Sequence, residues 1–225
     1  MSKNSNEDIH EISNVYNMIG IMSNKIKVGI IGGGKVGFLK ARKFINKGSK
    51  VEVISKSFYS EFYSIKSNNV ILIEDEYKED FIKDKHIIII AINNIEDINR
   101  IVEDCNKRYK LFINCYNYRN GLAVMTTERE TKNLCVSINS KLGNPIGTMM
   151  VANSVKGFIE EYDEFIEYTS LIRKRLKNNQ RYKDSILTFI NTEDFKEIYS
   201  IHKDRLVLTL FYGEDIIKAL YKKGD

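Results

Sequence analysis

The sequence predicts an α/β fold: a doubly wound parallel sheet, followed by a small α+β domain and a helical C-terminal tail. Three observations predict this arrangement. Short runs rich in isoleucine and valine alternate with helical patterns through the first half of the chain. A turn with several glycines separates the first such run from the first helical pattern. Beyond residue 150 the apolar residues recur at steps of three and four, which is the spacing of one helical face.

The expected strands of the sheet are short apolar runs. The run KHIIIIAI consists almost entirely of branched residues, which is typical of a parallel strand that is covered on both faces. Helices are expected between the strands, at FLKARKFINKG, which Gly48 ends as a C-cap, and at EDINRIVEDCNKR. The five expected strands cover residues 25–31, 50–55, 69–75, 85–92 and 110–116.

The pattern changes in the second half of the chain. Residues 121–143 read as two strands joined by the polar turn ERETKN, and the only proline, Pro145, follows them. The remainder reads as mainly helical, with TEDFKEIY and GEDIIKALYKK as capped helix starts. One helical face is expected to carry Val151, Val155, Phe158, Ile159, Tyr162, Phe165 and Ile166.

Composition limits the classes of function. The chain has 225 residues, of which 43% are hydrophobic, and its formal charge of +5 is a mild excess. This charge suits an anionic ligand and does not indicate nucleic acid. The sequence shows neither an apolar stretch of the ~20 residues that a membrane helix needs nor a signal peptide. We therefore expect a soluble cytoplasmic protein without membrane contact.

The cysteines and histidines do not show the spacing of a metal site. Cys105, Cys115 and Cys135 are widely separated and read as reduced cytosolic thiols. The histidines, at positions 10, 86 and 202, have no partner at ligand spacing. No metal is expected.

The glycine turn predicts a dinucleotide site of the Rossmann type. Residues 32–37 match G-x-G-x-x-G between a strand and a helix, which is the context that the motif requires. Gly32 allows the tight turn, Gly34 lets a pyrophosphate approach the backbone, and Gly37 lets the helix pack closely on the sheet. The helix N-terminus then offers free N–H groups to the phosphates. The residues expected at this turn are Gly32, Gly33, Gly34, Lys35, Val36 and Gly37.

The end of the second expected strand does not carry the acidic residue that usually binds the ribose 2′-hydroxyl, about 20 residues after the turn. Ser55, Lys56 and Ser57 occupy this position, and Glu52 comes too early in the strand. NAD is the expected cofactor, and NADP remains allowed.

Five motifs in order resemble the precorrin-2 dehydrogenase / sirohydrochlorin ferrochelatase family, the N-terminal part of siroheme synthases. The resemblance runs from about Tyr16 to Ile190. Within the second motif, Ala91, Asn93 and Asn99 occupy recurring positions of the family. The motifs are IGGGKVGFLKARKFINKGSKVEVIS, AINNIEDINRIV, LFINCYN, VSINSKLGNPIG and IRKRLKNNQRYKDSILTFI.

The resemblance implies NAD-dependent oxidation of precorrin-2 to sirohydrochlorin, in siroheme or cobalamin biosynthesis, with iron insertion in some members. It implies Ala91 and Asn93 as further cofactor-binding residues and a homodimer as the assembly. The implied domains are a flexible tail at 1–14, an NAD(P)-binding domain at 15–114, a dimerisation domain at 115–152 and a helical domain at 153–225. A hairpin as small as 121–143 has little core of its own, so pairing with a second copy is expected to bury it.

The sequence departs from the family at three positions. The proposed catalytic aspartate of the family falls on Asn117, and an amide cannot accept a proton as a carboxylate does. The family serine in the Ser-Pro turn, a tentative substrate contact, is Asn144. The family arginine of the first helix is Leu39, although Lys40 remains in place.

Basic residues of the helical tail, from Arg173 to Lys183, are expected either to line a cleft for the carboxylates of a tetrapyrrole or to form a solvated helix face. Two other functions stay open beside the dehydrogenase. One is a non-catalytic relative that binds tetrapyrrole or dinucleotide, which Asn117 suggests. The other is an unrelated Rossmann oxidoreductase or regulatory nucleotide-binding domain.

Overall fold

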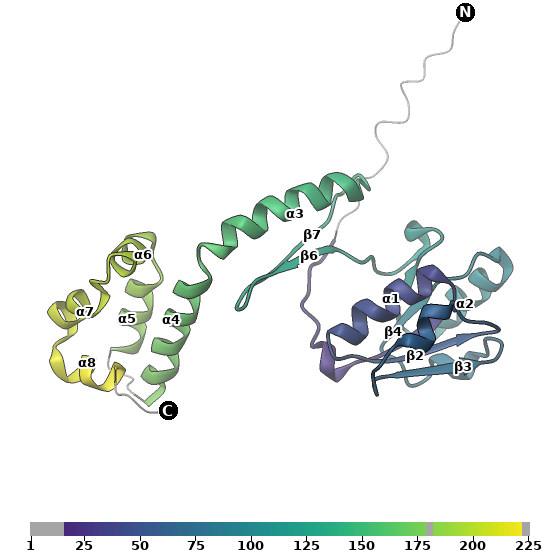
Figure 1. The fold of residues 1–225 in the computed structure, drawn as a ribbon, viewed down its shortest axis with the longest axis horizontal. Helices are drawn as coiled ribbons and strands as arrows, with labels where there is room; N and C mark the ends of the chain where they lie inside the picture. Colours follow the sequence, from purple (N-terminus) through teal and green to yellow (C-terminus); the bar gives the residue numbers. More distant parts are fainter. Residues whose placement is uncertain (1–15, 179–181, 222–225) are drawn as a thin grey trace, which may run out of the picture. The chain divides into compact units, whose positions relative to one another are not determined.

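The computed structural model describes residues 16–178 and 182–221. The chain divides into two compact units, and the boundary in the sequence lies between Met125 and Thr126. The first unit contains a five-stranded sheet with helices, and the second contains a hairpin and a series of helices (Figure 1). The expected tail at residues 1–14 lies outside the described residues. No helix in the described part is both long and apolar enough to span a membrane.

The first unit is built on a parallel sheet with the strand order β3-β2-β1-β4-β5, so β1 lies at its centre. All five strands and both helices predicted from the sequence are present, although four of the strands are shorter than their apolar runs. The elements are β1 (Lys27–Ile31), α1 (Lys35–Asn46), β2 (Lys50–Ser55), β3 (Val70–Glu74), β4 (Ile87–Ile90), α2 (Ile95–Lys107) and β5 (Leu111–Asn114). Short 3-10 turns cover Ser23–Lys25, Ser60–Ser64, Glu79–Ile82 and Tyr118–Asn120.

The four isoleucines of β4 contribute to both faces of the sheet. Ile87 and Ile89 belong to the core cluster that includes Phe38 of α1. Ile88 and Ile90 belong to the cluster that includes helix α2. All four are buried, so the prediction that this run is covered on both faces is confirmed.

The first unit continues beyond β5, past the boundary at residue 114 expected from the sequence. The backbone N–H groups of Leu122 and Ala123 both donate to the carbonyl oxygen of Phe112 in β5, at 3.0 Å. Ala123 and Met125 also pack against the core cluster on the α1 side of the sheet. These contacts attach the segment after β5 to the sheet and move the boundary to Met125.

The second unit begins with an antiparallel hairpin of β6 (Thr127–Glu130) and β7 (Cys135–Ile138). The sequence predicts a hairpin here, but its expected turn ERETKN is placed too early, because the first three residues of that segment belong to β6 and the turn covers residues 131–134. Within the described residues, six helices and one 3-10 turn follow. They are α3 (Pro145–Glu160), α4 (Asp163–Arg175), η6 (Leu176–Asn178), α5 (Lys183–Ile190), α6 (Glu193–Ser200), α7 (Asp204–Tyr212) and α8 (Glu214–Leu220).

The single helical face expected over residues 151–166 is wrong, because the helix is interrupted between Glu160 and Asp163. Phe165, in α4, is buried in the core of the helical tail. Val151 and Phe158, in α3, are exposed. The apolar pattern therefore belongs to two helices with different environments, and on α3 the described residues cover Val155 and Ile159 only in part.

Hydrogen bonds at the hairpin turn hold it against the start of α4. The carboxylate of Asp163 accepts from the hydroxyl of Thr131 and from the backbone N–H of Asn133, and these bonds lower the pKa of Asp163. Lys132 forms an ion pair with Glu167 at 2.7 Å. The turn at residues 131–134 thus attaches the hairpin to the helical tail.

The helices of the tail share one core, which includes Phe195, Ile172, Ile186 and Leu208. Thr192 caps α6, because its hydroxyl accepts a hydrogen bond from the backbone N–H of Phe195 at 3.2 Å. This confirms the capped start predicted at TEDFKEIY. The start of α8 at Gly213 has no side-chain cap.

A charged network lies at the amino ends of β1 and β4. The ammonium of Lys85, only 4% exposed, is 2.7 Å from the carboxylate of Glu52 and 2.6 Å from that of Asp84. Lys27 contacts Asp84 from the other side at 2.9 Å. Hydrogen bonds from Lys85 and Lys27 lower the pKa of Asp84 from its ordinary value of 3.8 to about 2.

We predict that Asp84→Asn removes an acid-dependent part of the stability. The depressed pKa means that Asp84 stabilises the fold above pH 3.8 and loses this effect as the pH falls towards about 2. The urea midpoint of the variant should lie below that of the native chain at neutral pH, and the difference should shrink between these two pH values. A difference that stays constant on acidification would contradict the role given to Asp84.

Candidate functional site

The candidate site lies at the carboxyl ends of β1 and β4 (Figure 1). The strand order reverses at β1, because the chain continues to β2 and β3 on one side and returns to β4 and β5 on the other. Parallel sheets bind ligands at such a switch point. The glycine turn at residues 32–37 follows β1, and the segment 91–94 follows β4.

Three glycines of the turn are required by the backbone around them. Gly32 has a φ of +115°, and a Cβ there would overlap the carbonyl oxygen of Ala91. A Cβ on Gly33 would overlap the carbonyl oxygen of Ser57. A Cβ on Gly37 would overlap the carbonyl oxygen of Gly32, so only glycine lets α1 start this close to β1.

Gly34 differs from these three because no atom lies within 4 Å of the place where its Cβ would be. It is the N-cap of α1, with a φ of −75° that any residue can adopt, and the first turn of α1 carries no acidic side chain. The N-terminal N–H groups of a helix lack partners within the helix and attract anions. The open space over Gly34 therefore fits a pyrophosphate, whereas Lys35 and Val36 are exposed beside it.

The end of β2 forms one wall of the turn. A Cβ on Gly33 would lie 2.8 Å from the Cβ of Ser55, so the predicted residues Ser55, Lys56 and Ser57 are beside the glycines. Glu52 forms an ion pair with Lys85 in the charged network at the amino ends of the strands. This agrees with the expectation that Glu52 comes too early in β2 to bind the ribose.

The structure adds Glu76 to this wall, which the sequence analysis missed. Its carboxylate is 2.8 Å from the ammonium of Lys56, and the pair raises the pKa of Lys56 and lowers that of Glu76. Ser55 pairs with Glu74 across the β2–β3 ladder, which brings the residues after each strand together. No local sequence pattern indicates Glu76, because it reaches Lys56 only through the pairing of β2 with β3.

The segment after β4 forms the other wall. The N–H of Ala91 donates to the carbonyl oxygen of Ile31 at 2.8 Å, and its own carbonyl oxygen lies against Gly32. Asn93 is exposed. Asn94 caps α2 by accepting from the N–H of Asp97 at 3.0 Å. Ala91 thus lies against the glycine turn, and the side chain of Asn93 is exposed at the same carboxyl ends of the strands.

Asn117 follows β5 and is exposed. The side-chain oxygen of the buried Asn114 accepts from the N–H groups of Tyr116 and Asn117, at 3.0 and 3.1 Å, and fixes this turn. The side-chain oxygen of Asn117 accepts from the N–H of Arg119 at 3.1 Å and caps a 3-10 turn. Burial raises the pKa of the neighbouring Cys115 thiol.

Asn144 has a structural role in the second unit. Its side-chain oxygen accepts from the N–H of Gly147 at 2.9 Å, and its carbonyl oxygen accepts from the N–H of Thr148 at 3.0 Å. It is the N-cap of α3, with Pro145 as the first helical residue. Its contacts among the described residues are those of a helix cap.

Metal ligands are not grouped in the part of the chain that the structure describes, since it contains no cluster of three or more His, Cys, Asp and Glu side chains suited to an ion. The candidate site is therefore defined by backbone N–H groups, exposed polar side chains and the Lys56–Glu76 pair.

Comparisons with known proteins agree with this fold. Residues 19–125 match the family described as "Putative NAD(P)-binding". A Methanocaldococcus jannaschii protein named "Putative precorrin-2 dehydrogenase" is 27% identical over 187 residues, which cover 76% of this chain and 88% of that protein. The solved structure of SirC, a precorrin-2 dehydrogenase, superposes with a TM-score of 0.68 at 16% identity, over 88% of this chain and 100% of that one.

We predict that Gly34→Asp abolishes dinucleotide binding without unfolding the protein. The backbone angles of Gly34 suit any residue and its surroundings are open, so the side chain fits while its charge repels the pyrophosphate. Calorimetry with NAD and NADP, together with the melting temperature, measures both effects. The matched control is Gly37→Ala, where overlap with the Gly32 carbonyl should lower the melting temperature. Unchanged affinity in Gly34→Asp would place the ligand elsewhere.

Proposed function

We propose that this chain, whose resemblance to the precorrin-2 dehydrogenase family the comparisons confirm, oxidises precorrin-2 to sirohydrochlorin with NAD. The observation that carries the proposal is the open approach to Gly34 at the switch point of the sheet, on the part of the chain that matches the NAD(P)-binding family. NAD would accept a hydride from the macrocycle, and the protein would bind and orient both molecules.

The residues on the two walls of the turn would bind different parts of the cofactor. The N–H groups at the start of α1 would bind the pyrophosphate, and the residues after β2 would hold the adenosine ribose. The residues after β4 would lie beside the nicotinamide, and Asn117 would face the macrocycle. The proposed cofactor-binding residues are Gly32, Gly33, Gly34, Lys35, Val36, Gly37, Ser55, Lys56, Ser57, Ala91 and Asn93.

Asn117 limits the chemistry that this site can perform. Its amide donates and accepts hydrogen bonds but cannot take up a proton at neutral pH. General-base catalysis commonly contributes about 10²–10⁴ in rate, whereas proximity and orientation still allow hydride transfer without it. The same residue favours the second candidate function, a relative that binds a tetrapyrrole or dinucleotide without converting it. Iron insertion, as in the bifunctional members, would be a further activity of the same site.

Mixing the purified protein with NAD and enzymatically prepared precorrin-2 tests the proposal directly. Formation of NADH together with the absorbance of sirohydrochlorin supports a dehydrogenase. Binding of both ligands without turnover supports the non-catalytic alternative, and failure to bind NAD contradicts both.

We predict that Asn117→Asp raises precorrin-2 oxidation, iron insertion or both. A tenfold gain requires only ~1.4 kcal/mol of transition-state stabilisation. The side chain is exposed and acts as a cap, and aspartate caps as well as asparagine, so the melting temperature should not change. Asn120→Asp, an exposed neighbour with the same change in charge, is the control and should have no effect on rate. Equal rates in all three proteins would remove Asn117 from the chemical centre.

The Lys56–Glu76 pair supports NAD over NADP as the cofactor. The 2′-phosphate of NADP would lie at the end of β2, where the ammonium of Lys56 is already held by a carboxylate at 2.8 Å. Glu76 would repel this phosphate and would have to release Lys56 before the lysine could bind it. The carboxylate that usually discriminates against NADP would thus come from the end of β3 in place of the end of β2.

We predict that Glu76→Gln improves the affinity for NADP several-fold and leaves that for NAD nearly unchanged. Calorimetric titration with both dinucleotides measures the ratio. Asp75→Asn is the matched control, because Asp75 carries the same charge one residue earlier but pairs with Lys78. Combining Glu76→Gln with Lys56→Ala should cancel the gain. An unchanged NADP:NAD ratio contradicts this account of selectivity, whereas loss of all binding would contradict the dinucleotide site itself.

The expected homodimer would also explain the exposed apolar residues around the hairpin and α3. Soluble monomers rarely expose large contiguous apolar patches. The exposed large apolar residues here are Leu142, Ile146, Met149, Met150, Val151 and Phe158. A second copy pairing through residues 115–152 would cover this surface.

We predict that Met150→Lys converts the dimer to a monomer, because a charge in the buried centre of the interface would lack a partner. Met150 is 67% exposed in the single chain, so the substitution should not disturb folding. Leu210→Lys, at a residue 74% exposed on α7, is the control and should remain dimeric. Light scattering at micromolar concentration distinguishes these states, and a monomeric native protein would contradict the proposal.

A further inference from the structure

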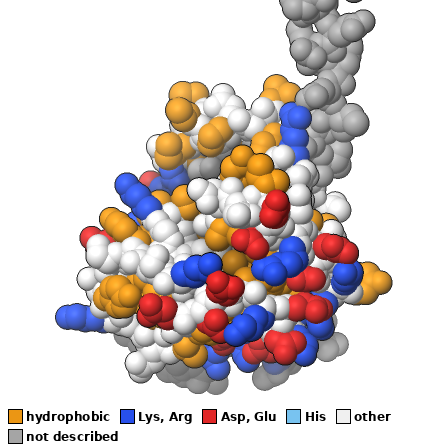
Figure 2. All heavy atoms as spheres, turned by 90° about the vertical axis from the view of Figure 1, so that its right-hand side faces the viewer, with side chains coloured by type: hydrophobic (Ala, Val, Ile, Leu, Met, Phe, Trp, Pro, Cys, Tyr) orange, Lys and Arg blue, Asp and Glu red, His pale blue; other side chains and the backbone are white. Residues whose placement is uncertain are grey.

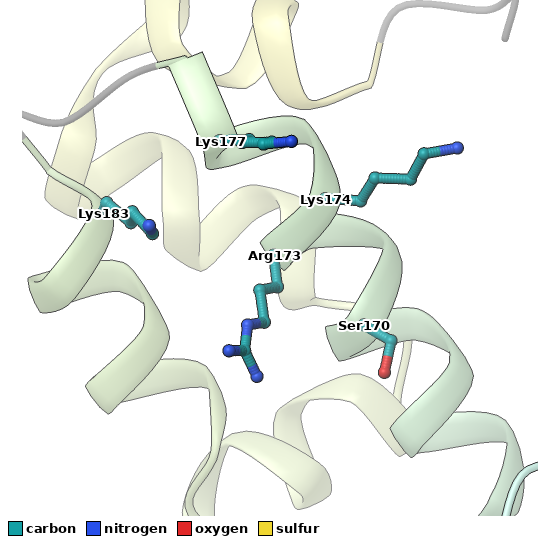
Figure 3. A pocket seen from close by; sticks show the side chains of 5 residues that line it. All are labelled: Ser170, Arg173, Lys174, Lys177 and Lys183. Atoms are coloured by element: carbon teal, nitrogen blue, oxygen red, sulfur yellow. The ribbon is translucent and has the colours of Figure 1, made fainter. Parts of the chain in front are cut away.

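The end of α4 and the start of α5 form a pocket of about 390 Å³ in the helical tail (Figure 3). Its lining contains four cationic side chains and one hydroxyl. Figure 3 shows Arg173 projecting into the space between the two helices, with Lys183 reaching into the same space from α5. The lining residues are Ser170, Arg173, Lys174, Lys177 and Lys183.

The charge of this pocket is unbalanced. Among the described residues, no acidic side chain lines the pocket and none of its four cations has an ion-pair partner. Elsewhere the two signs are mixed. Figure 2 shows a face on which basic and acidic side chains lie among one another, and Lys132, in the same unit as the pocket, is paired with Glu167.

Helix stability explains only some of these basic residues. Arg173 and Lys174 lie in the last turn of α4, where cations stabilise the negative end of a helix. Arg175, in the same turn, donates to the carbonyl oxygen of Leu220 and does not line the pocket. Lys183 is the first residue of α5, where the positive end of the helix disfavours a cation. The position of Lys183 therefore adds positive potential to the pocket without stabilising its own helix.

We propose that this pocket binds a small anion with two or more negative charges, through carboxylate or phosphate oxygens. The planar guanidinium of Arg173 can bind two oxygens at once, the lysines supply further positive charge, and the hydroxyl of Ser170 can donate a hydrogen bond. This site does not depend on the proposed dehydrogenase activity. Its ligand is either a polycarboxylate or a phosphate compound.

Calorimetry with uroporphyrin and with pyrophosphate tests the site and separates these two sources. The protein should carry Gly34→Asp in every titration, so that the glycine turn does not contribute binding of pyrophosphate. Lys183→Glu should weaken the affinity for the bound probe about tenfold. Lys203→Glu is the matched control, since Lys203 is an exposed lysine at the start of α7 and does not line the pocket.

Arg173→Gln provides a second variant that removes one charge without adding an acid, and it should weaken binding in the same direction. Binding of uroporphyrin alone identifies a carboxylate site, binding of pyrophosphate alone a phosphate site, and binding of both a general anion site. Two results overturn the proposal. In one, neither probe binds. In the other, Lys203→Glu weakens binding as much as Lys183→Glu does.

Discussion

The close approach of α1 to β1 is the constraint on which the rest of the first unit depends. The carbonyl oxygen of Gly32 lies where a Cβ of residue 37 would be, so the helix can begin directly above the end of the strand only with glycine there. A Cβ on Gly33 would likewise overlap the residues after β2. Gly34 is left open and exposed, which separates the glycine that we propose binds a ligand from those that packing requires.

The amino and carboxyl ends of the strands have different roles. At the amino ends, Lys85 is buried between Glu52 and Asp84 and forms an ion pair with each of them. At the carboxyl ends, backbone N–H groups and exposed polar side chains come from the glycine turn, the end of β2 and the segment after β4. The isoleucines of β4 are buried on both faces between these two ends, so the ion-pair network lies at one end of the strand and the proposed ligand site at the other.

Local patterns in the sequence were sufficient to predict the strands, the glycine turn and the cap at Thr192, because each depends on neighbouring residues. Features that depend on pairing between distant segments were not predicted. Glu76 reaches Lys56 only through the β2–β3 register, and the segment up to Met125 joins the first unit only through its contacts with β5 and the core. The break between α3 and α4 was missed because the apolar spacing continues across it.

The central claim is that the carboxyl ends of β1 and β4 hold the dinucleotide. Amide hydrogen exchange with and without NAD tests this claim most directly. The account predicts slower exchange on NAD addition at residues 32–37, 55–57 and 91–93, with little change in the amino-end segment around Lys85. Protection in the helical tail without protection of the glycine turn would contradict it.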